Sequence, residues 1–168
     1  MGDVKAKMYM VDAFTRNPLE GNPCSVMVSS VFIPLATRQR IAKQTNTVVT
    51  AFVSWRKCLN NTFAVDVRYE TPTSSLELCG HATLACTKVL YDEYMIPHDE
   101  VIDFYYTDEM KLTAKWCDAF DISINMPQLP LTEIDRNDND VLKSICDGLN
   151  ISVDDVVYFG RNIYDYVL

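Results

Sequence analysis

Residues 78–86, which read Leu-Cys-Gly-His-Ala-Thr-Leu-Ala-Cys, constrain the fold of this chain more than any other stretch. They follow a strand-like run at residues 64–69 and a polar loop at residues 70–77, and they open a helix that runs to about residue 94. Apolar side chains occur nearly all round this helix, so we expect most of its faces to be buried. These apolar positions are Ala82, Leu84, Ala85, Cys86, Val89 and Leu90.

The start of the helix has the chemistry of an anion site. The first N–H groups of a helix have no partner inside it, and Gly80 lets a ligand approach the backbone closely. A helix N-terminus attracts a carboxylate or phosphate, and the same field lowers the pKa of a nearby thiol such as Cys79. Because His81 and Thr83 stand beside them, the sequence predicts a small-anion site with acid–base groups next to it.

Composition narrows the class of protein. The 168 residues suit one domain or at most two small ones, and 48% of them are apolar, which is enough to build a core. Fifteen Lys and Arg stand against 23 Asp and Glu without any basic run, which argues against nucleic acid or an anionic membrane as a partner. Six scattered cysteines, no C-x-x-C pair, no signal region and no bilayer-spanning stretch favour a cytoplasmic protein with free thiols.

The order of the predicted elements indicates an α+β fold with one buried helix in the middle. Predicted strands cover residues 7–14, 24–28, 48–55, 62–69, 101–106, 110–116, 120–126, 156–159 and 164–168. Predicted helices cover residues 34–45, the helix to about 94, and 140–149, where Asp140 is the expected N-cap. Residues 56–61 are expected to form a hairpin loop, residues 127–140 a linker, and residues 160–162 a turn.

Several separated blocks of the chain resemble, in their order and spacing, the phenazine-biosynthesis PhzF-like family. The blocks are Val-Asp-Ala-Phe-Thr at 11–15, Gly-Asn-Pro at 21–23, Arg-Ile-Ala-Lys at 40–43, Thr-Ala-Phe-Val at 50–53, Arg68, Thr-Pro at 71–72 and Cys-Gly-His-Ala-Thr-Leu-Ala at 79–85. The chain also resembles the eukaryotic phenazine-biosynthesis-like domain proteins. The resemblance covers residues 1–168 as a single domain equivalent to the N-terminal half of a family member.

The resemblance implies a diaminopimelate-epimerase-like fold, in which a curved mixed β-sheet wraps around a central buried helix that starts at His81. It further implies two such domains related by a pseudo-dyad, with the active site between them. Family members act as isomerases or epimerase-like proton shuttles without a metal or organic cofactor. A carboxylate on the first domain moves the proton, and the helix N-termini hold the carboxylate of the substrate.

The chain departs from the family at three points. Residues 46–50 read Asn-Thr-Val-Val-Thr, so Val49 stands where the family has its catalytic Glu, and a Val has no proton to move. Ser75 stands where a Glu often precedes the Cys-Gly-His-Ala block. The 168 residues contain no second domain, so a homodimer or a missing C-terminal half would have to supply the second wall of the cleft. The chain also stops inside its last predicted strand, which suggests a boundary within a longer architecture or an edge left for pairing.

Cys79 and His81 are the candidate catalytic residues, and each has two interpretations. Cys79 is either a base at the helix N-terminus or a small buried residue, and the need for a second acid on the opposite face of the carbon favours the latter. His81 either shuttles a proton or is a structural His held by backbone. A zinc site from these two residues and Cys86 is disfavoured, because residues 81 and 86 do not share a helix face.

By resemblance, the substrate-binding residues are Asn22, Thr71, Gly80, Ala82 and Thr83. For Asn22, Thr71 and Thr83, turn, loop or capping chemistry is the alternative role. Asp12 and Glu77 are the remaining nearby carboxylates; we expect Asp12 to be a structural partner and Glu77 to be solvated.

Two functional hypotheses follow. The first is a PhzF-like isomerase-fold protein that binds a small carboxylate metabolite at the helix start, with any catalysis carried by Cys79 and His81. The second is a catalytically inactive binding or protein-interaction module, which the substitution by Val49 favours. In both, we expect an exposed apolar face where a second domain or a second copy would pack.

Overall fold

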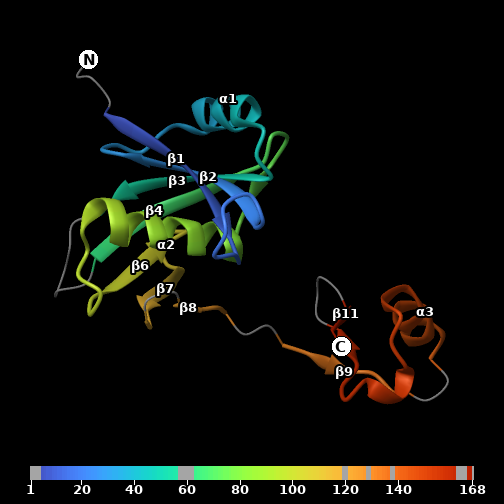
Figure 1. Cartoon of the computed structure of the whole chain (residues 1–168). Helices are drawn as coiled ribbons and strands as arrows, with labels where there is room; N and C mark the ends of the chain where they lie inside the picture. The colour runs from blue at the N-terminus through green and yellow to red at the C-terminus, as the bar shows by residue number, and fades with distance from the viewer. Residues whose placement is uncertain are drawn as a thin grey trace. The chain divides into compact units, whose positions relative to one another are not determined.

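The computed structural model describes residues 5–56, 63–118, 121–127, 130–136, 139–161 and 166–167. The chain divides into two compact units, Met1–Met126 and Pro127–Leu168 (Figure 1). Both combine short strands with helices, so the predicted α+β class is confirmed. The assignment of residues 1–168 to one domain that equals half a family member stays a prediction.

The first unit is built on one mixed sheet whose strands follow the order β1-β2-β3-β4-β6-β7-β8. The β2–β3 and β4–β6 pairs are parallel, and the other neighbours in this order are antiparallel. The strands are β1 (Ala6–Ala13), β2 (Asn22–Ser29), β3 (Val49–Trp55), β4 (Phe63–Glu70), β6 (Val101–Tyr105), β7 (Lys111–Trp116) and β8 (Ile122–Asn125). A two-residue strand, β5 (Ser75–Leu76), pairs with β4 inside the segment that was expected to be a polar loop.

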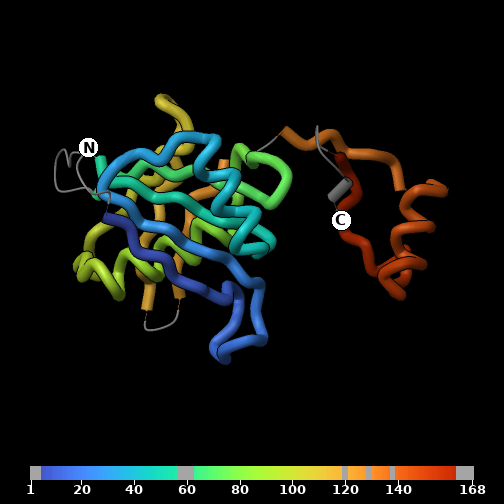
Figure 2. The backbone as a smooth tube through the Cα atoms, turned by 90° about the horizontal axis from the view of Figure 1, so that it is seen from above, coloured from blue at the N-terminus to red at the C-terminus, as the bar shows by residue number. Residues whose placement is uncertain are grey.

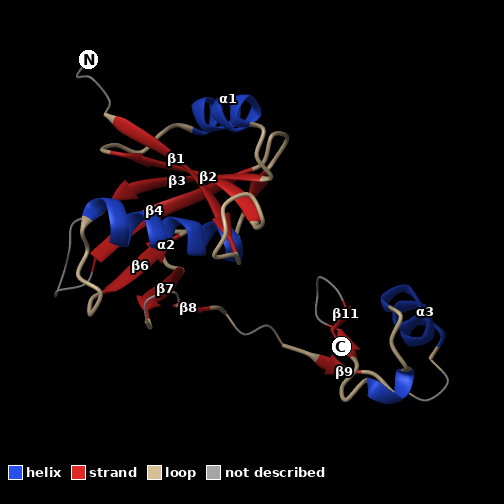
Figure 3. Cartoon of the chain, in the orientation of Figure 1, coloured by secondary structure: helices blue, strands red, loops and turns tan. Residues whose placement is uncertain are grey.

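Helix α2 (Gly80–Tyr94) lies in the hollow of this sheet, as Figures 1 and 3 show. It contacts β1, β2 and β3 near one end of the sheet order and β7 and β8 at the other, so the sheet curves around it. Figure 2 shows β1 to β4 running side by side. The predicted burial of α2 on most of its faces is confirmed. Its buried residues are Ala82, Thr83, Ala85, Cys86, Thr87, Val89, Leu90 and Tyr91.

Alternation along the strands explains the core. Val49, Ala51 and Val53 of β3 belong to the same buried cluster as α2, whereas the residues between them face the other side of the sheet. Val65, Val67 and Tyr69 of β4 repeat the pattern. This register matters for function, because it decides which residue of each strand faces the start of α2.

Helix α1 (Leu35–Thr45) packs on the opposite side, against β3 and β4. Its Arg38 forms a buried ion pair with Glu70, with 2.7 Å between Nε and Oε1. The Gln39 and Ser75 side chains donate to the other carboxylate oxygen of Glu70, and Arg38 also donates to the Ile33 carbonyl. Glu70 is 1% exposed, so this full set of donors replaces the water that its charge has lost.

The second unit is small. It contains β9 (Thr132–Glu133), β10 (Gly160–Arg161) and β11 (Tyr166–Val167), in the antiparallel order β11-β10-β9. Helix α3 (Asp140–Leu149) and a 3-10 turn, η1 (Val153–Asp155), complete it. Its core consists of Leu142, Cys146, Val156 and Phe159.

Four sequence predictions for the second unit are wrong. The expected linker at residues 127–140 contains strand β9, which pairs with β10. Residues 156–159 do not form a strand: Val156 and Phe159 are buried, yet the ladder begins only at Gly160. The expected turn at residues 160–161 is therefore strand β10. The N-cap of α3 is Asn139 rather than Asp140, because its side chain accepts from the N–H groups of Val141 and Leu142. Most of the expected hairpin loop at 56–61, and Asn162 of the expected turn, lie outside the described residues.

Candidate functional site

Three strand ends and one helix start meet at one end of the first unit. The start of β2 pairs with the start of β3 through Cys24 and Val49, and the start of β3 pairs with the end of β4 through Thr50 and Glu70. The Tyr69 hydroxyl at the end of β4 lies 2.5 Å from Thr83 Oγ1 in the first turns of α2. The fold therefore brings parts of several blocks that were singled out by resemblance, on β2, β3, β4 and α2, to one end of the first unit.

The first turn of α2 has open backbone donors. Its N-cap, Cys79, is extended and makes no side-chain cap, and the turn contains no acidic residue. The first helical bond runs from the Thr83 N–H to the Cys79 carbonyl, at 3.0 Å. Among the described residues, nothing accepts from the N–H groups of Gly80 and His81. These two donors, with the positive end of the helix dipole behind them, form an electrostatic site for an anion.

Cys79 is 8% exposed, and its Sγ lies 3.3 Å from His81 Nδ1. Burial raises the pKa of this thiol, and the Ala82 backbone N–H lowers it by a smaller amount. The net direction is opposite to the one expected from the helix field alone, because loss of water disfavours the thiolate more than the field favours it. Cys79 is therefore a neutral thiol at pH 7.

His81 is half-buried, and burial lowers the pKa of its imidazole. Its Nδ1 faces Cys79, whereas its Nε2 is buried and has no hydrogen-bond partner among the described residues. The structural interpretation requires hydrogen bonds between backbone groups and this ring, and the described residues form none. A buried nitrogen without a partner is unfavourable, so His81 retains capacity for one further hydrogen bond.

Two buried thiols and a tyrosine lie behind the helix start, and sequence reasoning did not include them in the site. Burial and the neighbouring Cys79 raise the pKa of Cys24 to about 12. Burial also raises the pKa values of Cys86 and Tyr69 well above their ordinary values. The surroundings of the helix start are thus poorly solvated on the inner side, where thiols are unreactive. The alternating pattern of β2 and β4 was the available signal, since it turns Cys24 and Tyr69 inward.

Val49 occupies the position at which the resemblance puts a catalytic Glu. It is the first residue of β3, it is 2% exposed, and it belongs to the same buried cluster as Cys24, Cys79 and Ala82. The position therefore faces α2, but a methyl group stands where a carboxylate would be needed.

The predicted ligand contacts divide into two groups. Thr83 and Ala82 are fully buried, and Thr83 Oγ1 donates to the Cys79 carbonyl. Both residues therefore belong to the core and not to the accessible surface. Thr71 closes its own turn by accepting from the N–H groups of residues 73 and 74, which is its alternative role. Asn22 and Gly80 are half-buried, and the Asn22 amide has no hydrogen bond within the described part of the chain. With His81, they remain available to a ligand.

Other carboxylates near this end are not placed as bases. Asp12 Oδ2 accepts from the Leu19 N–H at 2.8 Å, so its predicted structural role is confirmed. Glu77 is exposed, as expected.

No group of three His, Cys, Asp or Glu side chains that could hold a metal ion occurs in the described ranges. In the same ranges, no helix has both the length and the apolar character needed to cross a membrane.

Large apolar side chains are exposed on the loops and strand ends around the helix start. Phe14 and Leu19, in the loop between β1 and β2, are 74% and 93% exposed. Val48, immediately before β3, and Leu76 of β5 are exposed as well. The expectation that these side chains form one uncovered apolar face on the first unit stays a prediction.

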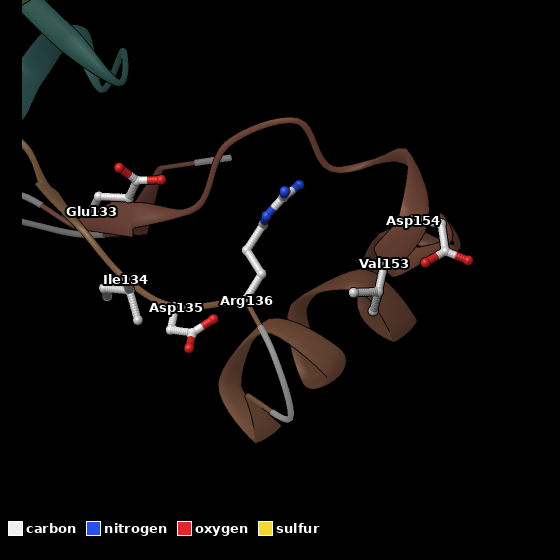
Figure 4. Close-up of a pocket in the computed structure, with 6 residues that line it drawn as sticks. All are labelled: Glu133, Ile134, Asp135, Arg136, Val153 and Asp154. Carbon is white, nitrogen blue, oxygen red and sulfur yellow. The ribbon is translucent and has the colours of Figure 1, made fainter.

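A separate cavity of about 690 Å³ belongs to the second unit (Figure 4). Its lining is mostly exposed and charged, and the Arg136 guanidinium there donates to the Val156 carbonyl. None of the predicted site residues lines it. The cavity is lined by Glu133, Ile134, Asp135, Arg136, Val153 and Asp154.

Comparison with known proteins agrees with this fold. A family profile described as phenazine biosynthesis-like protein matches residues 11–157. An uncharacterized isomerase of Halalkalibacterium halodurans is 32% identical over 161 residues, which cover 96% of this chain and 56% of that protein. A phenazine biosynthesis-like domain-containing protein of Bos taurus is 32% identical over 113 residues, which cover 64% of this chain and 38% of that protein.

A crystal structure of a phenazine biosynthesis PhzC/PhzF protein from Clostridium difficile (strain 630) superposes with a TM-score of 0.68 at 27% identity. The superposition covers 94% of this chain and 55% of that one. The chain thus spans about half, or less, of the length of the proteins that it matches.

Proposed function

This chain belongs to the phenazine biosynthesis-like (PhzC/PhzF) family, and we propose from that premise that it binds a small carboxylate metabolite at the start of α2. The observation that carries the proposal is the pair of open N–H donors of Gly80 and His81 at a helix end without an acidic residue or a capping side chain. The buried Nε2 of His81 offers a further polar contact. Asn22 is the remaining accessible amide at this end.

A ligand held only at this end of the unit would be open to solvent on its other side. The exposed Phe14, Leu19, Val48 and Leu76 support a covering partner. In keeping with the length of the relatives, that partner is either a second domain or a second copy of this chain. The activity, substrate and partners of the longer relatives are part of this proposal and not a premise of it.

Isomerase chemistry at this site would have to use groups other than the Glu that the resemblance implies. Val49 offers no proton, so a carbon acid bound here would depend on the Cys79 and His81 pair. Both groups are neutral at pH 7, because burial raises the pKa of the thiol and lowers that of the imidazole. The resulting base is weak, and the substitution of the Glu by a packed Val favours the second candidate, a binding module without turnover.

Binding is tested with two substitutions at the first helical residue. Gly80→Pro removes one open N–H, and proline suits this position because Cys79 before it is already extended. Gly80→Ala keeps the N–H, and its added Cβ would meet only Met126 Cε at 3.7 Å. Titration with lactate and malonate, followed by calorimetry, is expected to show affinity lowered roughly five- to tenfold by the proline alone, about the worth of one hydrogen bond. Equal affinities of the two variants would contradict the proposal.

Turnover is tested by the uptake of solvent deuterium at the α-carbon of 2-hydroxy and amino acids. We expect no measurable exchange with the wild-type chain. Exchange that disappears in Cys79→Ala would reject the binding-module alternative. Val49→Glu restores the missing carboxylate; exchange gained by this variant alone would show that the site lacks only its base.

A further inference from the structure

Three methionines share one face of the β1–β2 pair, at the edge of the sheet that β1 forms. The antiparallel register sets Met8 directly opposite Met27, and Met10 opposite Ser25. Because alternate residues of a strand point to the same face, Met8, Met10 and Met27 lie on one side of the sheet. The residues that alternate with them pack in or against the buried cluster around α2; these are Tyr9, Val11, Val26 and Val28. The three thioethers therefore lie on the outer face of the sheet, away from α2 and from the proposed carboxylate site.

These methionines are accessible to solvent, and one of them has its sulfur held in place. Met10 is 71% exposed and Met8 is 44% exposed, whereas Met27 is half-buried. The Ser25 hydroxyl donates to Met10 Sδ at 3.4 Å, which draws this sulfur across β1 onto β2. Ser25 stands two residues before Met27 on the same face, so the Met10 sulfur is held on the side of Met27. A thioether sulfur has two lone pairs, and this hydrogen bond uses one of them.

The spacing of the three positions suits a single ion. Residues directly opposite in an antiparallel pair have Cβ atoms about 4.5–5.5 Å apart, and diagonal neighbours are about 7–8 Å apart. Met8 and Met27 are opposite each other, and Met10 and Met27 are diagonal neighbours. A methionine side chain has three rotatable bonds and a polarizable sulfur, so three of them at these distances can direct their sulfurs to one point.

The thiols of the chain compete poorly for a soft metal ion at this surface. A cysteine binds metal as the thiolate, and burial raises the pKa of the Cys24, Cys79 and Cys86 thiols. Cys146 is buried as well, and Cys117, directly after β7, is the exposed thiol of the described residues. A thioether has no proton to lose, so the methionines are available as ligands at neutral pH.

We propose that Met8, Met10 and Met27 bind one Cu(I) ion through their three sulfurs, on the outer face of β1 and β2. Thioethers are soft ligands that favour Cu(I), whereas Zn²⁺ is bound by thiolate, imidazole and carboxylate groups. The net charge of −8 on the chain favours the approach of a cation. This site goes beyond the proposed carboxylate binding and does not depend on it.

The test is a titration of the chain labelled with [methyl-¹³C]methionine, followed by NMR. Cu(I) is added without oxygen as its acetonitrile complex, to a chain that carries Cys117→Ser and Cys58→Ser; Cys58 lies outside the described residues. We expect saturable shifts of the Met8, Met10 and Met27 methyl signals together. The signals of Met95 and Met110, which are 85% and 52% exposed, are expected to stay in place.

Substitution by leucine keeps the volume of each side chain and removes its sulfur. Met8→Leu, Met10→Leu and Met27→Leu are each expected to raise the dissociation constant for Cu(I) at least tenfold, measured by competition with bicinchoninate. Met110→Leu is the matched control, because it removes an exposed thioether elsewhere in the first unit.

Three results would overturn the proposal. The first is a Cu(I) titration in which the three methyl signals do not move, or move no more than those of Met95 and Met110. The second is any of the three leucine variants binding Cu(I) as tightly as Met110→Leu. The third is a titration with Zn²⁺ that shifts the same three signals, because thioethers should not bind that ion.

Discussion

Burial decides the protonation of the residues around the start of α2. The helix field alone would lower the pKa of Cys79, but its burial beside Cys24 and Cys86 has the larger effect. Three thiols and the Tyr69 hydroxyl consequently keep their protons well above neutral pH. This part of the molecule is a neutral, poorly solvated layer behind two open N–H donors.

Because these buried groups keep their protons in the folded chain, we expect the chain to lose stability at alkaline pH. The pKa of Cys24 is about 12 in the folded chain against an ordinary 9.0, so above pH 9 the unfolded chain loses a proton that the folded chain keeps. Stability is therefore full below pH 9 and falls as the pH rises towards 12, by at most ~1.4 kcal/mol per pH unit for each such thiol. Urea unfolding of wild type and Cys24→Ala between pH 8 and 10.5 measures this. The variant should show the shallower fall, and equal slopes would contradict the assignment.

The sequence predicted the residues of the helix start but not their surroundings. Gly80 and His81 follow from a local motif, and local motifs set helix ends. The proximity of Cys24 to Cys79 depends on the packing of α2 on β2, which brings together residues far apart in the chain. The parallel register of β2 and β3 then places Val49 beside Cys24 in the same buried cluster.

Among the elements, α1 is fixed to the sheet by charge rather than by apolar area. Arg38 and Glu70 are both buried, and Gln39 and Ser75 complete the shell of the carboxylate. Ser75 stands where the family often has a Glu, and here it supports a different carboxylate.

Removing the Glu70 charge should be strongly destabilising. Glu70→Gln leaves the Arg38 charge buried without a counter-ion, for which we expect a loss of about 3–5 kcal/mol in the free energy of unfolding. Asp92→Asn is the control, because the Lys88–Asp92 pair is exposed and should contribute below about 1 kcal/mol. Chemical denaturation measures both; similar losses in the two variants would refute the structural role of the buried pair.

Two glycines give a paired test of the loop and helix geometry. A Cβ on Gly21 would lie 2.5 Å from the Ala13 carbonyl oxygen, so Gly21→Ala should destabilise the first unit by about 1–3 kcal/mol. A Cβ on Gly148 of α3 would meet nothing within 4 Å, so Gly148→Ala should stabilise the second unit by about 0.5–1 kcal/mol. Thermal unfolding gives the sign of each change, and the opposite signs would contradict the close approach at Gly21 and the open space beside Gly148.

Periodicity predicted the elements of the first unit well and those of the second unit less well. The first unit has long strands around one apolar helix, so alternation and helical period are both readable. In the second unit, Val156 and Phe159 of the apolar run at residues 156–159 are buried by packing against α3 and not by strand pairing. A short apolar run indicates burial but does not distinguish these two ways of achieving it.

At the scale of the whole molecule, the curved sheet of the first unit holds a buried helix whose first two residues, Gly80 and His81, are half-buried. The fold and the family follow from the sequence blocks, because most of these blocks belong to strands of the curved sheet or to α2 itself. The function follows less directly, since Gly80 and His81 offer open N–H donors at the helix start, whereas Val49, where the resemblance puts a catalytic Glu, is packed in the core.

The most direct test of the carboxylate site is an amide chemical-shift titration of the ¹⁵N-labelled chain with lactate, with sodium chloride at matched ionic strength as the control. Binding at the helix start predicts saturable shifts that are largest for the N–H signals of Gly80 and His81, accompanied by a shift of the Asn22 side-chain amide. Shifts confined to other residues, or identical shifts with chloride, would contradict the carboxylate site.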